Sequence, residues 1–157
     1  MRPIKIIIIS FIGLFAAIAI FLYSSVWLWP ELWGSRRLGK MLYLLSWDND
    51  TKIVVYGNAV IGNTCHGGAY IIPSDTTGLT GEYVLDAIPF PNHIIVLSCL
   101  YTMNENKYYL ISKDYEAKDT ICVDSIIKCI HPYDDFICFS NICDSLGISI
   151  PPSWKYH

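Results

Sequence analysis

The stretch HIIVLSCLYTMNENKYYLIS, residues 93–112, decides the fold, because it contains two apolar runs joined by a short connection. The runs Ile94–Leu100 and Tyr108–Ser112 are rich in the β-branched and aromatic residues that favour strands. The segment between them, YTMNENK, is typical of a hairpin connection. We therefore expect the two runs to pair as antiparallel neighbours.

The segments around this hairpin also predict short strands. From residue 48 onward, short apolar runs alternate with Gly, Pro, Asn and Asp, which is the pattern of strands and turns. Further strands are expected at Lys52–Tyr56, Ala69–Ile72, Tyr83–Leu85 and Ser125–Ile130.

The segment DDFICFSNICDSLG, residues 134–147, has a helical period instead. Its apolar residues at helical spacing are Phe136, Phe139, Ile142, Cys143 and Leu146. Asp134 or Asp135 lies near the start of this segment, and Gly147 follows its last apolar residue. The predicted fold class is therefore α+β, with a small, mostly antiparallel sheet and one C-terminal amphipathic helix that covers one face.

An uncharged apolar run occupies residues 6–29, IIIISFIGLFAAIAIFLYSSVWLW. As a helix it would be about 36 Å long, enough to cross a bilayer. It predicts an N-terminal transmembrane helix within an anchor of residues 1–30. A cleaved signal peptide is the alternative, because Arg2 and Lys5 precede the run and Ala17-Ile18-Ala19 has the form of a cleavage site. A buried soluble helix is a third reading.

Residues flanking the run fit a membrane interface. The expected interface residues are Tyr23, Trp27, Trp29, Trp33, Arg36, Arg37 and Lys40. Residues 31–47 form a predicted juxtamembrane segment, in which helical spacing of apolar residues over 38–45 suits a helix in the headgroup region. Alternatively, Met41–Leu45 begins the folded domain as a buried strand.

The expected location follows from this arrangement. A short tail before a signal-like apolar run is typical of proteins whose bulk is exported. We therefore expect a single-pass membrane protein whose domain, residues 48–157, lies outside the cytoplasm, in the periplasm or the extracellular space.

The charge of the chain is divided unevenly. The 157 residues carry a net charge of -3, but residues 41–157 hold six lysines, no arginine and thirteen acidic residues, a net charge of -7. Nucleic-acid binding requires clustered cations, so this composition argues against it. An aromatic content of 14% and the lack of repeats exclude collagen-like and fully disordered chains.

All six cysteines fall within the expected exported domain. The disulfide candidates are Cys65, Cys99, Cys122, Cys129, Cys138 and Cys143. Their pairing cannot be read from the sequence, although a bond between Cys138 and Cys143 is disfavoured because the two lie about 140° apart around a helix.

Other chemistry has weaker support. The Cys65-His66-Gly67-Gly68 segment could place a thiol at a tight turn, or contribute to a metal site, but no C-x2-C or C-x3-C pair is present. Adjacent strand residues also point to opposite faces, so His66 is poorly placed to activate Cys65. We assign no catalytic residue, no metal ligand and no cofactor.

Four segments in order, GGAYIIP, NHIIVLS, KYYLIS with Lys113 after it, and DDFICFSNICDSLGI, resemble a small uncharacterised α+β domain family of bacterial secreted proteins and lipoproteins. The resemblance covers residues 53–148. The chain departs from the family in its apolar N-terminal run, which replaces a lipobox cysteine, and in its extra cysteines. The resemblance implies an exported α+β domain and assigns no activity.

These observations predict a binding protein more readily than an enzyme. The expected function is protein binding by a membrane-anchored domain, as an envelope accessory or immunity-type protein, with the bilayer and another protein with a basic surface as partners. The alternative is a cysteine-dependent enzyme or metal-binding domain that uses Cys65 and His66. The oligomeric state and the host are not indicated by the sequence.

Overall fold

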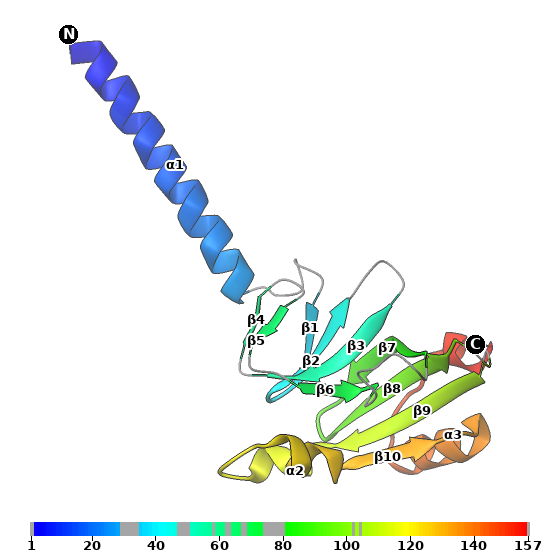
Figure 1. Ribbon diagram of the computed structural model, residues 1–157. Coiled ribbons are helices and arrows are strands. Elements are labelled where there is room, and N and C mark those ends of the chain that lie inside the picture. Colours follow the sequence, from blue (N-terminus) through cyan, green and yellow to red (C-terminus); the bar gives the residue numbers. More distant parts are fainter. Residues whose placement is uncertain are drawn as a thin grey trace.

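A long N-terminal helix and a mostly antiparallel β domain make up the chain in the computed structural model (Figure 1). The structure describes the backbone of residues 2–28, 35–46, 51–57, 59–61, 64–66, 69–73, 81–101, 103 and 105–156. It describes the side chains of residues 11–24, 35–46, 51–57, 69–73, 81–101, 103 and 105–155.

The N-terminal helix α1, Arg2–Leu28, extends away from the β domain (Figure 1). Its side chains are described over residues 11–24. In this described part of the chain, no helix is long and apolar enough to cross a membrane. This finding contradicts the predicted transmembrane helix and the predicted single-pass membrane localisation.

The expected interface residues have different positions in the structure. Tyr23 lies on α1 and is 70% exposed. The side chain of Trp27, and both Trp29 and Trp33, lie outside the described residues. The three cations Arg36, Arg37 and Lys40 belong to a β-hairpin of the folded domain.

The main sheet has eight strands. Their bounds are β1 Ser35–Gly39, β2 Leu42–Ser46, β3 Lys52–Tyr56, β6 Ala69–Ile72, β7 Glu82–Pro89, β8 His93–Leu100, β9 Glu105–Ser112 and β10 Ile130–Tyr133. The order is β1-β2-β3-β7-β8-β9-β10, β6 pairs with β3, and all pairings are antiparallel. Two further strands, β4 Ala59–Ile61 and β5 Thr64–His66, form a separate hairpin.

The predicted central hairpin is confirmed. β8 and β9 pair along their whole length, from His93 opposite Ser112 to Leu100 opposite Glu105. The strands predicted at Lys52–Tyr56 and Ala69–Ile72 are also present with those bounds. The strand predicted at Tyr83–Leu85 is longer than expected, since β7 continues to Pro89.

The strand predicted at Ser125–Ile130 is wrong. Residues Val123–Ile127 form helix α2, and β10 begins only at Ile130. Ser125 stabilises the start of this helix, because its hydroxyl donates to the Cys122 carbonyl at 2.7 Å and accepts from the Cys122 N–H at 3.2 Å. The predicted fold class therefore omitted a helix as well as including an unsupported membrane span.

Residues 35–46 form part of the same sheet as the rest of the domain. β1 and β2 form a hairpin, and β2 pairs with β3 from Leu42 opposite Tyr56 to Ser46 opposite Lys52. Of the two readings of this segment, the buried strand is confirmed. At the turn, Met41 has a positive φ of 65° and the Lys40 N–H donates to the Glu116 carboxylate at 2.8 Å.

Two halves of the sheet meet at a single residue pair, Lys52 opposite Val84. Beyond this pair, side chains rather than backbone groups form the hydrogen bonds to this edge of β7. Lys52 Nζ donates to the Leu85 carbonyl at 2.8 Å, and Arg36 Nη2 donates to the Ala87 carbonyl at 2.7 Å. Arg36 also forms an ion pair of 2.6 Å with Asp86. These bonds satisfy carbonyls that would otherwise lack partners at the edge of β7.

The described core has three clusters, of which Leu45, Ile53 and Val55 form the smallest, and alternation along β8 places its side chains in the other two. Ile94 and Val96 pack on one face of the sheet with the β1–β2 hairpin and α2. This cluster includes Leu38, Leu42, Val54, Ile71, Tyr115 and Ile126. Ile95 and Leu97 pack on the other face with Tyr108, Leu110, Phe139, Cys143, Ile148 and Trp154. The 3₁₀ helix η2, Lys113–Ala117, supplies Tyr115, and the C-terminal 3₁₀ helix η3, Pro152–Tyr156, supplies Trp154.

The predicted C-terminal helix is confirmed as α3, Phe136–Ser145. Asp135 caps its start by accepting the Cys138 N–H at 2.9 Å, and Gly147 follows its end with a φ of 69°. This helix covers the second core cluster, where Phe139 stacks on Tyr108 with ring centroids 5.1 Å apart.

Candidate functional site

The predicted disulfide candidates are dispersed over the fold. The five cysteines whose side chains are described have free thiols: Cys99, Cys122, Cys129, Cys138 and Cys143. The side chain of Cys65 lies outside the described residues, as does that of His66. The disulfides therefore stay a prediction.

The free thiols differ in environment. Cys143 lies on the buried side of α3, and burial raises the pKa of its thiol to about 11. Cys122 and Cys138 are both exposed. Hydrogen bonds from Ser125 lower the pKa of the Cys122 thiol, whereas the Asp135 carboxylate raises the pKa of the Cys138 thiol. Among the described side chains, no group of three or more His, Cys, Asp or Glu is placed to hold a metal ion.

Three aliphatic side chains of α3 and its C-cap are exposed. Phe139 and Cys143 are fully buried, while Ile137 is 68%, Ile142 39% and Leu146 45% exposed. At about 100° per residue, Ile142 and Leu146 lie about 40° apart and next to Phe139, whereas Ile137 lies about 140° from Ile142, on the far side of the helix. The sequence grouped Ile142 and Leu146 with the buried pair by helical spacing, and both are nevertheless exposed.

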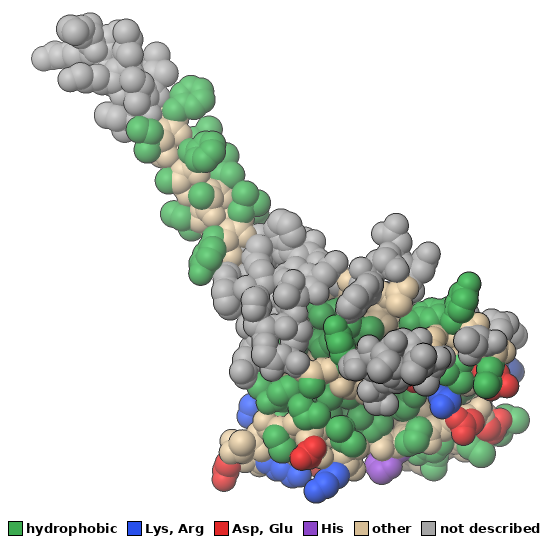
Figure 2. Space-filling view, viewed as in Figure 1, with side chains coloured by type: hydrophobic (Ala, Val, Ile, Leu, Met, Phe, Trp, Pro, Cys, Tyr) green, Lys and Arg blue, Asp and Glu red, His purple; other side chains and the backbone are tan. Residues whose placement is uncertain are grey.

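Acidic side chains lie at both ends of α3. Asp134 and Asp135 precede α3 and Asp144 lies in its last turn, and no Lys or Arg occurs between Lys128 and Lys155. Asp135 accepts the Cys138 N–H, and this bond lowers the pKa of its carboxyl. Acidic side chains gather at the end of the domain where α3 lies (Figure 2).

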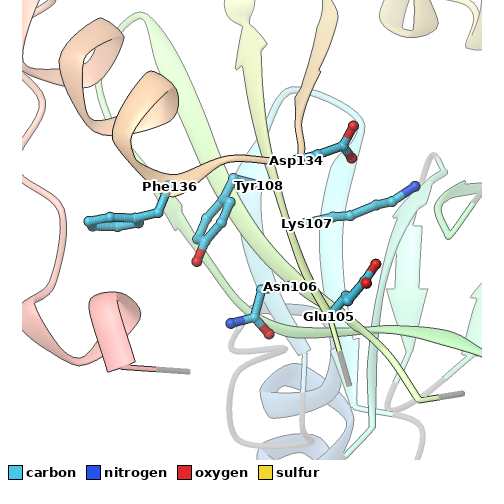
Figure 3. A pocket seen from close by; sticks show the side chains of 6 residues that line it. All are labelled: Glu105, Asn106, Lys107, Tyr108, Asp134 and Phe136. Atoms are coloured by element: carbon cyan, nitrogen blue, oxygen red, sulfur yellow. The ribbon is translucent and has the colours of Figure 1, made fainter. Parts of the chain in front are cut away.

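A depression of about 420 Å³ adjoins the start of α3. Its lining residues are Glu105, Asn106, Lys107, Tyr108, Asp134 and Phe136 (Figure 3). Because strand side chains alternate, Tyr108 and Asn106 lie on one side of β9, and Lys107 and Glu105 lie on the other (Figure 3). Phe136 joins the aromatic side, with its ring centroid 5.5 Å from that of Tyr108, and Asp134 joins the charged side.

A buried polar network lies next to the charged side of the depression. The Ser98 hydroxyl, which is fully buried, donates to Glu82 Oε1 at 2.7 Å, and the Tyr109 hydroxyl donates to the same oxygen at 2.5 Å. Burial, and then the Glu82 carboxylate, raises the pKa of Tyr109, so this phenol keeps its proton. The network satisfies the buried Ser98 hydroxyl and ties three strands together.

We use the name α3 surface for the exposed apolar residues Ile137, Ile142 and Leu146, the acidic residues Asp134, Asp135 and Asp144, and the adjoining depression. Sequence reasoning identified the helix but missed this surface. The signal was present in part, since the acidic residues and the absence of nearby cations can be read from the chain.

Comparisons of the chain with family models, curated proteins and solved structures find no match. The resemblance to the small domain family of secreted proteins and lipoproteins therefore stays a prediction.

Proposed function

We propose that this protein is a binding domain that docks another protein on the α3 surface. The observation that carries the proposal is the exposure of three large aliphatic side chains along a well-capped helix and at its C-cap. Full burial of such a side chain contributes about 1.5–3 kcal/mol, so a partner that covers them would favour association. Exposed apolar residues with a polar rim are typical of interaction sites.

Charge selects the kind of partner. Asp134 and Asp135 lie at the start of α3 and Asp144 at its end, and a second copy of the chain would bring the same three negative charges. Like charges across an interface oppose association, so self-pairing through this surface is disfavoured. A partner that combines apolar residues with Lys or Arg would complement both features of the surface.

Peptide selection on the full-length protein tests this proposal. Random peptides displayed on phage are selected on immobilised wild-type protein, and we expect the enriched sequences to combine Lys or Arg with apolar residues. Their affinity is then measured for the double variant Ile137→Ser/Ile142→Ser. The matched control is Ile127→Ser, because Ile127 is 52% exposed on α2 and lies outside the α3 surface.

We expect the double variant to lose at least about tenfold in affinity, because two partly buried aliphatic contacts contribute more than about 1.4 kcal/mol. The control should bind like the wild type, and circular dichroism should show that all three proteins are folded. Enrichment of acidic peptides, or equal binding to the double variant and the wild type, would contradict the proposal.

A further inference from the structure

The edge of β9 is only partly covered by its neighbour. β10 pairs with β9 from Ile130 opposite Ile111 to Tyr133 opposite Tyr108, and the pairing ends there. β9 begins three residues earlier, at Glu105, and these residues still pair with β8 on the other side. The chain leaves the sheet after Tyr133 because Asp135 caps α3. Residues 105–107 thus form a free strand edge within the described part of the sheet.

The ladder determines which backbone groups face this edge. The Ser112 N–H donates to the Cys129 carbonyl, so Ser112 faces the β10 side, and the Ser98 hydroxyl reaches the Lys107 carbonyl, so Lys107 faces β8. Backbone groups alternate in direction along an antiparallel strand. The N–H and C=O of Asn106 therefore point away from β8, toward the free edge.

This edge runs through the depression shown in Figure 3. Asn106 lies between the aromatic side, with Tyr108 and Phe136, and the charged side, with Glu105 and Asp134. An added strand would place successive side chains on alternate sides of the sheet. A residue opposite Asn106 would contact the rings, and its neighbours in the strand would reach the carboxylates.

We propose that the partner contributes a short extended segment that continues the sheet at Asn106. This segment carries an apolar or aromatic residue against Tyr108 and Phe136, and a Lys or Arg next to it against Glu105 and Asp134. Two carboxylates face one ammonium group, that of Lys107, on the charged side, so a basic side chain is favoured there. The inference rests on the proposed function and specifies how the partner binds. Strand addition of this kind supplies affinity through main-chain hydrogen bonds and specificity through alternate side chains.

A proline substitution at Asn106 can remove the hydrogen bond that its backbone N–H would donate to an added strand, and no other. In Asn106→Pro the missing N–H is the one that faces the free edge, so the bonds between β8 and β9 remain. Glu105, which would precede the proline, is already extended, as such a residue must be. The matched control is Asn106→Ala, which loses the same side chain but retains the backbone N–H.

The probe is a synthetic peptide in which Lys alternates with Phe, and its affinity for the full-length chain is measured by fluorescence anisotropy. We expect Asn106→Pro to weaken binding about tenfold and Asn106→Ala to change it less than about twofold, because only the first loses a main-chain donor. Methylation of the backbone nitrogens of the peptide should weaken binding to the wild type in the same way.

The outcomes separate this inference from the proposed function. If Asn106→Pro binds the peptide as well as the wild type does, or if the wild type does not bind it, pairing at Asn106 is overturned. If phage-selected peptides bind Ile137→Ser/Ile142→Ser and the wild type equally, the proposed function itself fails. The comparison requires that Asn106→Pro is folded, with a circular dichroism spectrum like that of the wild type. If Asn106→Ala loses binding of the peptide as Asn106→Pro does, strand addition is also overturned.

Discussion

Replacing Gly39 with alanine should destabilise the β domain through a steric conflict with η2. A Cβ atom at this position would lie 2.6 Å from Glu116 Oε1, 2.6 Å from the Tyr115 hydroxyl oxygen and 3.5 Å from Ile94 Cδ1. Tyr115 is fully buried and has little room to move. Moving Glu116 would stretch the 2.8 Å hydrogen bond that it accepts from the Lys40 N–H.

The cost can be estimated from these contacts. Overpacking by one methyl group costs about 1–3 kcal/mol, and we expect a value near 2 kcal/mol because two atoms must move. Urea denaturation of the full chain measures this loss of unfolding free energy. With a slope of about 2 kcal/mol per molar urea, the midpoint should fall by about 1 M while the slope stays unchanged.

Two other glycines provide controls. Among the described residues, apart from the adjacent ones and the backbone of the glycine's own helix, no atom lies within 4 Å of the position that a Cβ would take at Gly147 or Gly13. Gly147 has a φ of 69°, so Gly147→Ala should cost about 1 kcal/mol through the backbone alone. Gly13 lies within α1, where alanine is the better helix former, so Gly13→Ala should not destabilise the protein.

A mutant cycle tests whether the clash of the added Cβ with Tyr115 and Glu116 causes the loss of stability. In a Tyr115→Phe/Glu116→Ala background, both oxygens near Gly39 are absent, so Gly39→Ala should cost less than half of what it costs in the wild type. Equal costs in the two backgrounds would refute the steric explanation. A cost for Gly39→Ala below about 0.5 kcal/mol would also refute it, because changes of that size are typical of unconstrained surface positions.

Two further predictions concern thiol reactivity and pH. Iodoacetamide near neutral pH should modify Cys122 faster than Cys138, although both are exposed, because the pKa of Cys122 is lowered and that of Cys138 is raised. Cys143 is buried and should react only after denaturation. Peptide mapping by mass spectrometry measures the order of modification, and faster modification of Cys138 than of Cys122 would contradict this prediction. The Asp135 carboxyl has a lowered pKa in the folded state, so it stabilises the fold above its unfolded pKa of about 4 and loses that contribution as the pH falls through the folded value. Asp135→Asn keeps a capping side chain that does not titrate, so the urea midpoint of this variant should fall less than that of the wild type between about pH 5 and pH 2. Equal falls in the two proteins would show that Asp135 does not cause the loss of stability at low pH.

Local sequence signals were sufficient for the central hairpin and for α3. Strand propensity and a short connection predicted that Ile94–Leu100 pairs with Tyr108–Ser112, and the structure has this pairing. An acidic cap at Asp135 and a glycine at Gly147 bounded α3 correctly. These signals depend on residues close in sequence, so they remain valid whatever the rest of the chain does.

The same reasoning failed where a segment satisfies two patterns. Ile126, Ile127 and Ile130 suit a strand by composition, but the hydrogen bonds between Cys122 and Ser125 stabilise a short helix, and cysteine is not among the usual capping residues. In the β1–β2 hairpin, Arg36 was assigned to a membrane interface. The structure instead pairs it with Asp86, which is 50 residues away in sequence, and no local pattern indicates such a contact.

For the candidate site, too, the sequence predicts some features and only the folded structure decides the others. The sequence by itself determined that an acidic domain with few cations would end in an amphipathic helix. It did not determine which apolar side chains of that helix are buried, because the sheet beneath α3 contacts only the side that bears Phe139 and Cys143. Ile137 lies on the far side of the helix, whereas Ile142 and Leu146 lie next to the buried pair by helical spacing and are exposed all the same.

The free edge at Asn106 likewise exists only in the folded chain. Strand propensity identifies β9, but the register of β10 and the point at which the chain turns into α3 decide which residues of β9 lack a neighbour. Short-range periodicity and capping therefore determined the type of each element, whereas exposure, edge pairing and the juxtaposition of aromatic and acidic groups were decided by tertiary structure. The physical reason is that burial and strand pairing depend on segments distant in sequence, whose contacts form only when the whole sheet is assembled.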